Sequence, residues 1–173
     1  MSTPAPTKAV LCATVAILVV ALTVFLAARE PEMEPRFAGW FLLVFALLFA
    51  VRVAGQLVVV LRGPRWLPPM ESGQWNLMPY RLLLPIQLLF LAVMGWLVAS
   101  FLAESGPPTE PQPAFGWFVI GFSAVYATAM VVRYVVRMRR RPEERWFGGA
   151  IPIVFHWVLA GFLFVFGSYH ASH

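Results

Sequence analysis

One arginine, Arg52, lies near the middle of an apolar stretch that runs from Phe37 to Leu61, and no acidic residue lies inside any apolar stretch of this chain. A charge at bilayer depth costs at least about 2.5 to 3.5 kcal/mol on insertion scales, so such a residue usually marks a buried polar pocket or a functional site. Arg52 is therefore the first candidate for chemistry, as the counter-ion of an anionic or carbonyl-bearing ligand. The alternative is that the surrounding bundle stabilises it or that it extends toward the inner interface.

Other polar side chains fall at a similar depth in other apolar stretches. At a rise of 1.5 Å per residue, Arg52, Gln87, Tyr126 and His156 all lie about 10 to 16 Å from the inner ends of their stretches. Gln56 follows Arg52 by one helical turn and shares its face. A guanidinium has five donors, and amide, phenol and imidazole groups can accept them. The sequence therefore predicts a ligand-binding polar layer made of Arg52, Gln56, Gln87, Tyr126 and His156.

A histidine inside an apolar stretch also suggests haem. Haem b in membranes commonly needs two histidines at one depth on facing helices, whereas His156 and His170 would be about 21 Å apart on a single helix. A methionine such as Met94 or Met130, a second copy or another subunit would have to supply the missing ligand. We therefore favour a packing role for His156 and a solvated position for His170 and His173. The candidate cofactors are bound lipid, quinone or tetrapyrrole, and no metal site is predicted.

The residues needed for enzymatic catalysis are incomplete. Ser123 and His156 could form a nucleophile and base, but the chain contains no Asp, and no Glu lies in a stretch to orient the imidazole. No GxxxxGK[ST] loop is present for phosphoryl transfer. The single cysteine, Cys12, excludes a CxxC pair and a cysteine-based metal cluster within one chain. A non-enzymatic role is therefore the expectation.

A basic segment follows the fourth apolar stretch. Such a cluster next to a membrane is attracted to anionic lipid by about 1 kcal/mol per basic residue near the surface. It can also act as a topology anchor or as a docking patch for an acidic partner. The candidate residues for lipid or partner docking are Arg133, Arg137, Arg139, Arg140, Arg141 and Arg145.

The elements that must position these residues follow from composition. A hydrophobic share of 60% and a charged share of 12%, with a mean hydropathy of +0.76, are typical of a membrane protein. A window of about 20 residues finds five apolar stretches, at 9–28, 37–61, 77–103, 114–138 and 149–169. The sequence therefore predicts an all-α fold, a single integral membrane domain over residues 1–173 built as a five-helix transmembrane bundle.

Charge distribution predicts the orientation of this bundle. Basic residues concentrate at the amino terminus and around the second and fourth connections, as in the cytoplasmic segments of membrane proteins. Five of the eight acidic residues lie in the first and third connections: Glu30, Glu32, Glu34, Glu104 and Glu110. We expect a bacterial inner membrane, with the amino terminus inside and the carboxyl terminus outside. The first stretch is longer than the apolar part of a signal peptide, which favours an uncleaved anchor over cleavage after Leu26-Ala27-Ala28.

The second stretch carries two different faces. Ala46, Ala50 and Ala54 recur every four residues and predict a face on which another helix packs closely. Phe45, Phe49, Arg52 and Gln56 share a nearly opposite face. Two further expectations concern Pro85 and Pro152, where each proline removes a helical hydrogen bond and frees a carbonyl.

These features together favour an accessory or scaffolding subunit of a larger membrane complex, which binds lipid or a hydrophobic cofactor. The expected partners are membrane lipids and other membrane subunits or further copies of the chain, and no nucleic acid. One alternative is a small carrier or channel for an anion or weak acid that uses Arg52. A second alternative is a membrane redox protein that binds a tetrapyrrole or quinone through His156.

Overall fold

The computed structural model describes residues 5–29, 32–62, 80–140 and 150–173, and these residues contain helices and turns but no strand. The helices are α1 (Ala5–Ala27), α2 (Pro35–Arg62), α3 (Tyr80–Leu102), α4 (Pro113–Arg140) and α5 (Ala150–Ala171), with a short 3-10 helix, η2 (Pro107–Thr109). Their ends differ from the predicted stretches by four residues or fewer. The prediction of an all-helical chain with five long helices is confirmed for the described residues.

Four of these helices are long and apolar enough to cross a membrane. The segments are Pro35–Val58, Leu83–Leu102, Pro113–Val136 and Val154–Ala171. In α1, the apolar part that can be assessed is Ile17–Ala27, which is shorter than the roughly 20 residues that a bilayer requires. The chain therefore has the properties of a helical membrane protein with four candidate membrane-spanning helices. That α1 crosses the membrane as a fifth helix stays a prediction.

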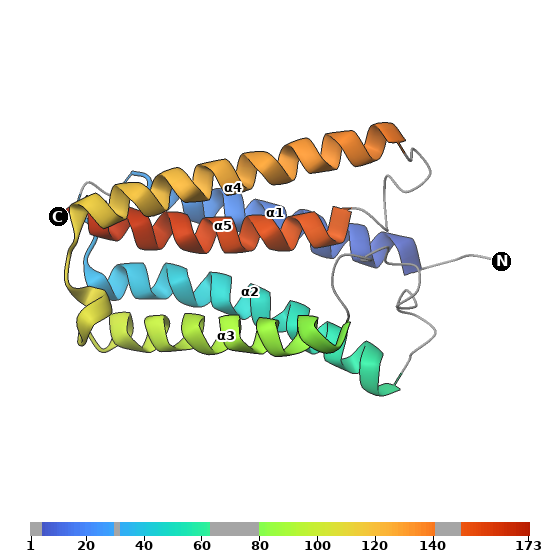
Figure 1. The fold of residues 1–173 in the computed structure, drawn as a ribbon, viewed down its shortest axis with the longest axis horizontal. Helices are drawn as coiled ribbons and strands as arrows, with labels where there is room; N and C mark the ends of the chain where they lie inside the picture. The colour runs from blue at the N-terminus through green and yellow to red at the C-terminus, as the bar shows by residue number, and fades with distance from the viewer. Residues whose placement is uncertain (1–4, 30–31, 63–79, 141–149) are drawn as a thin grey trace.

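Helix α5 is the centre of the bundle (Figure 1). Helix α4 packs along α5, helix α3 packs along α2, and both α1 and α2 pack against α5. Successive helices run in opposite directions, so the two ends of the chain lie at opposite ends of the bundle (Figure 1). Half of the α5 span is buried, against 28% for the α2 span and less for those of α3 and α4. The helix α5 is therefore the most enclosed of the four candidate spans.

Glycines allow the closest approaches between these helices. A side chain at Gly116 of α4 would place its Cβ 2.4 Å from the Ala171 nitrogen of α5, so the two backbones are in contact there. A Cβ on Gly161 of α5 would lie 2.5 Å from the Phe45 ring of α2. Small residues commonly permit such contacts between membrane helices, where water cannot drive association.

The expected alanine face of α2 is only partly buried within this chain. Ala46 is buried, but Ala54 is exposed, so a close helix contact at Ala54 stays a prediction. The opposite edge carries the core residues Phe45 and Phe49, which are 0% and 4% exposed. Gly161 on α5 receives the Phe45 ring, and this partner cannot be read from the α2 sequence alone.

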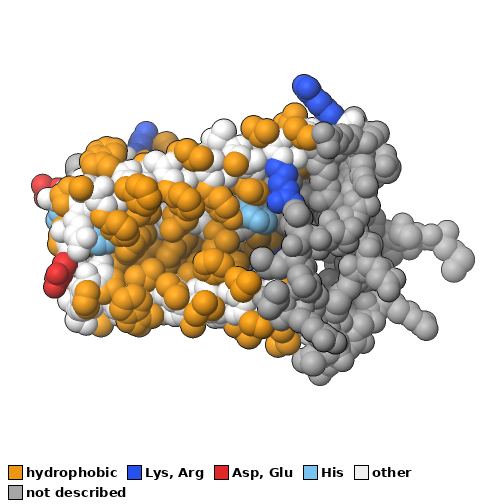
Figure 2. Space-filling view, viewed as in Figure 1, with side chains coloured by type: hydrophobic (Ala, Val, Ile, Leu, Met, Phe, Trp, Pro, Cys, Tyr) orange, Lys and Arg blue, Asp and Glu red, His pale blue; other side chains and the backbone are white. Residues whose placement is uncertain are grey.

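The described outer surface of the bundle is apolar between acidic side chains at one end and basic side chains that border the undescribed residues at the other (Figure 2). Large apolar side chains on α3 and α4 are strongly exposed, including Leu89 and Trp117, each at 65%. Exposure on this scale is costly in water and ordinary in a bilayer, where acyl chains are as apolar as leucine. The surface thus agrees with a membrane environment.

The two helix prolines lie at different depths in their helices. Pro85 is the sixth residue of α3, where it removes a hydrogen bond as expected. Pro152 is the third residue of α5. The carbonyl that Pro152 was expected to free belongs to Gly148, which lies outside the described residues.

Candidate functional site

Arg52 is half-buried on the side of α2 that faces α5. Its guanidinium carbon lies 5.2 Å from the centre of the Phe155 ring on α5. A cation over an aromatic face is stabilised by about 0.5 to 2 kcal/mol, depending on how far it is desolvated. The bundle therefore offsets part of the free-energy cost of burying this charge. This agrees with the alternative that the surrounding bundle stabilises Arg52.

Gln87 points from α3 into the bundle. It lies seven residues before Met94 and fourteen before Phe101, so the three share one face, and the latter two are 3% and 0% exposed. The Gln87 Oε1 atom is buried and has no hydrogen-bond donor among the residues that the structure describes. An amide oxygen normally accepts a hydrogen bond when it is buried, so this acceptor calls for an explanation.

The register between α2 and α3 sets the relative depth of Arg52 and Gln87. The two antiparallel helices touch where Gly39 meets the Leu102 backbone. Counted from that contact at 1.5 Å per residue, Arg52 is about 20 Å away along α2 and Gln87 about 23 Å away along α3. They therefore lie at nearly the same level. Gln56 is half-buried one turn further toward the carboxyl end of α2.

Tyr126 and His156 form a second polar pair, between α4 and α5. Their ring centres are 6.0 Å apart at an angle of 45°, and both side chains are half-buried. His156 follows Phe155 directly on α5. The ring that contacts Arg52 and the ring that contacts Tyr126 therefore lie on the same turn of α5, about 100° apart around its axis. The structure thus brings the predicted residues to one level of the bundle as two groups. Whether the layer binds a ligand stays a prediction.

Ser123 has a structural role. Its hydroxyl donates a buried 2.8 Å hydrogen bond to the Ala160 carbonyl oxygen, which ties α4 to α5. The hydroxyl is engaged with the backbone, and this observation gives no support to Ser123 as a nucleophile activated by His156.

His170 corrects a prediction. We expected it in a solvated tail, but it is 2% exposed near the end of α5. Four aromatic rings surround its imidazole, with centres 4.6 to 6.4 Å away: Phe101, Phe115, Phe166 and Tyr169. We call these five residues the outer cage. Neither ring nitrogen of His170 has a hydrogen-bond partner of good geometry in the described part of the chain, although the Glu110 backbone lies near it.

The outer cage is covered by the connection between α3 and α4. Tyr169 donates a 2.7 Å hydrogen bond from its hydroxyl to the Thr109 carbonyl oxygen in η2. The signal for this burial in the sequence is weak, because the covering rings come from α3 and α4. His173, by contrast, is exposed as expected, with its Nδ1 3.1 Å from the Tyr169 carbonyl oxygen.

The basic docking cluster is only partly described. Arg133 and Arg139 are exposed on the carboxyl-terminal half of α4. Arg137 and Arg140 also belong to α4, but their side chains lie outside the described residues, as do Arg141 and Arg145 entirely. Among the residues described, no group of three or more His, Cys, Asp or Glu side chains could hold a metal ion.

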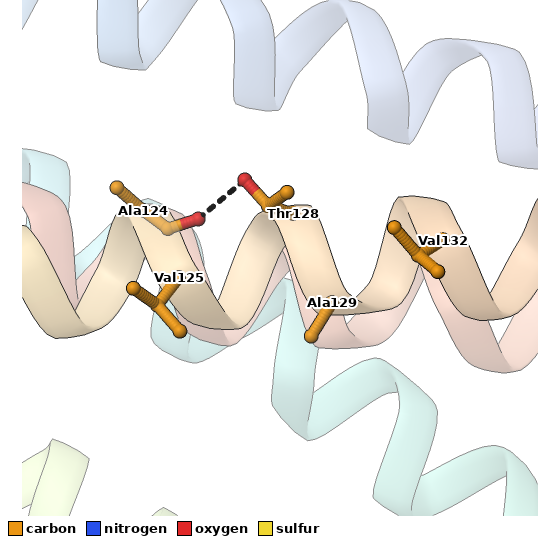
Figure 3. Close-up of a pocket in the computed structure, with 5 residues that line it drawn as sticks. All are labelled: Ala124, Val125, Thr128, Ala129 and Val132. Carbon is orange, nitrogen blue, oxygen red and sulfur yellow. Dashed lines mark hydrogen bonds between the residues drawn. The ribbon is translucent and has the colours of Figure 1, made fainter.

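A shallow open depression lies on the exposed face of α4 (Figure 3). Ala124, Val125, Thr128, Ala129 and Val132 line it. Its one hydroxyl, on Thr128, donates a 2.8 Å hydrogen bond to the Ala124 carbonyl oxygen of the same helix. This depression lacks the polar groups of the predicted layer, so it is not the candidate site.

Comparison with protein-family models, with curated proteins and with solved structures gives no match to this chain.

Proposed function

We propose that this protein is a non-enzymatic membrane subunit that holds a lipid or a hydrophobic cofactor against the polar layer. The observation that carries the proposal is the buried Gln87 Oε1, an acceptor without a donor among the described residues, at the level of Arg52. A ligand with a hydroxyl or amide head could satisfy this acceptor, while its anionic or carbonyl oxygen would interact with the guanidinium.

The exposed helix faces support a role as a subunit. Among the described helices, α4 packs extensively only on α5. Its opposite side exposes Trp117 and Phe118 at 65% and 68%. Such surfaces are available to acyl chains or to the helices of other membrane proteins. We further propose a bacterial inner membrane, with α1 as a fifth crossing, the amino terminus inside and the carboxyl terminus outside, since positive charge gathers at the inner end.

Purification in lipid nanodiscs followed by extraction and mass spectrometry tests the proposal. We expect the wild-type protein to retain a lipid or hydrophobic cofactor, and Gln87→Leu and Arg52→Leu each to reduce its occupancy several-fold. Leu89→Ala is the matched control, because Leu89 is exposed two residues from Gln87. Absence of any retained molecule or subunit in the wild type would contradict the proposal.

Two other outcomes would replace it. Anion flux in liposomes by the protein alone, abolished by Arg52→Leu, would identify a carrier or channel. A visible chromophore or extracted quinone whose binding requires His156 would identify a redox protein.

A further inference from the structure

A groove runs between α3 and α4 on the face shown in Figure 2, where two apolar ridges border a hollow. Phe166 of α5 lies 5.9 Å from Phe101 of α3 and 6.1 Å from Phe115 of α4, measured between ring centres. The face of α5 that carries Phe166 therefore lies between α3 and α4. Leu163 and Leu159 continue this face at helical spacing, and both are partly exposed. We call this surface the α3–α4 groove.

The groove is closed at its outer end. There the rings of Phe101 and Phe115 approach each other across His170, with centres 6.4 and 5.8 Å from the imidazole. Toward the inner end no extensive contact joins α3 to α4 among the described residues. A molecule can thus reach the groove from the side, but not through the outer cage.

One wall of the groove changes from apolar to basic. Phe115, Phe122, Tyr126 and Arg133 are spaced by seven, four and seven residues, so they share one face of α4. Phe122 and Tyr126 stack with their centres 6.2 Å apart and their planes within 6°. Arg133 is exposed and close enough to act electrostatically on Tyr126.

The depths of these groups match the parts of a phospholipid. Arg133 lies three residues inside the end of the α4 span, which is about 5 Å from the inner boundary. Tyr126 and its neighbour His156 lie about 10 Å deeper. Beyond them the described side chains of Leu159, Leu163 and Phe122 make the groove apolar.

We infer that the α3–α4 groove binds one anionic phospholipid from the leaflet on the Arg133 side. The phosphate group lies at Arg133, an ester carbonyl lies near Tyr126 and His156, and one acyl chain lies on Leu159 and Leu163. This inference rests on the proposed function, and it names the class of lipid and the residues that select it. Charge complementarity at one end and an apolar floor at the other fix the direction in which the lipid lies.

Native mass spectrometry in nanodiscs of mixed phosphatidylglycerol and phosphatidylcholine tests the inference on the full chain. We expect the wild type to retain phosphatidylglycerol over phosphatidylcholine by about fivefold. The attraction between one basic residue near the surface and an anionic lipid corresponds to a factor of about this size. Arg133→Gln should bring this ratio close to one. Leu163→Trp, or Leu159→Trp as a second variant, should remove the retained lipid of both kinds by filling the floor.

Two variants serve as matched controls. Arg36→Gln removes an exposed basic residue at the opposite end of the bundle, and Leu47→Trp adds the same ring to an exposed position of α2. Both should behave as the wild type. A phosphatidylglycerol preference that survives Arg133→Gln would overturn the inference, as would a photo-crosslinker at position 163 that captures a protein in place of lipid.

The same experiment separates the two proposals. Lipid retention that is lost in Gln87→Leu and Arg52→Leu, yet unchanged in Arg133→Gln and Leu163→Trp, would reject the α3–α4 groove and keep the polar layer. Retention of no lipid or cofactor in any preparation would reject both.

Discussion

The imidazole of His170 shows how strongly a single position depends on distant parts of the chain. Its burial comes from Phe101 on α3 and Phe115 on α4, each more than fifty residues away in the sequence. The sequence places Arg52, Gln87, Tyr126 and His156 at one depth because depth follows from counting along a helix. It cannot show which rings surround a side chain at a helix end, so His170 was not predicted.

Replacement of His170 by phenylalanine should stabilise the protein. A buried polar group without a hydrogen bond costs about 1 to 3 kcal/mol, and a phenyl ring of similar size has no such group. We expect His170→Phe to raise the midpoint of thermal unfolding in detergent, while the exposed His173→Phe leaves it nearly unchanged. A lower midpoint for His170→Phe would show that the imidazole makes an interaction essential to the outer cage.

Gly116 should tolerate no side chain. A Cβ at this position would meet the Ala171 and His170 backbone at 2.4 and 2.7 Å, and backbone atoms cannot move away as a flexible side chain can. We expect Gly116→Ala to lower the free energy of unfolding by about 1 to 3 kcal/mol through overpacking. Thermal or denaturant unfolding in detergent measures this change.

Gly121 provides the control on the same helix. A Cβ there has no atom within 4 Å. Gly121→Ala should therefore keep or slightly raise stability, since alanine favours a helix by about 1 kcal/mol over glycine. Equal losses at both positions would contradict the close α4–α5 contact.

At the scale of helices, the sequence predicts where each element begins and ends but not which face it buries. Prolines, glycines and charges interrupt the apolar runs, and the helix ends follow these interruptions closely. Apolar residues occur on all sides of the helices, so the faces that meet are decided by shape. On α2 the fit of Phe45 over Gly161 determined the buried face, and the alanine repeat did not.

The hydrogen bond between α4 and α5 should make a modest contribution to their association. Ser123 donates to the Ala160 carbonyl oxygen, and such interhelical bonds in membrane proteins contribute about 0.6 kcal/mol on average. We expect Ser123→Ala to destabilise the protein by about that amount in denaturant unfolding. Thr128→Ala, which removes a bond within α4 on its exposed side, is the control and should cost less.

At the scale of the whole molecule, the alternating helices place their ends in two sets at opposite ends of the bundle (Figure 1). In a Cys12→Ser background, we expect Glu34→Cys and Glu104→Cys to react with a membrane-impermeant maleimide on intact cells. Arg139→Cys should react only after permeabilisation, because positive charge remains inside. All three positions are exposed, so access does not limit labelling. Labelling of Arg139→Cys in intact cells would reverse the proposed orientation.

Helix α5 is the shared neighbour of α1, α2 and α4, yet it follows all of them along the chain. During synthesis the earlier helices are therefore made before their common partner exists, when only the α2–α3 interface and the smaller α1–α2 interface can form. Addition of α5 then completes its interfaces with α1, α2 and α4 in one step. A ribosome that stalls before residue 150 would leave α4 without the helix on which it packs.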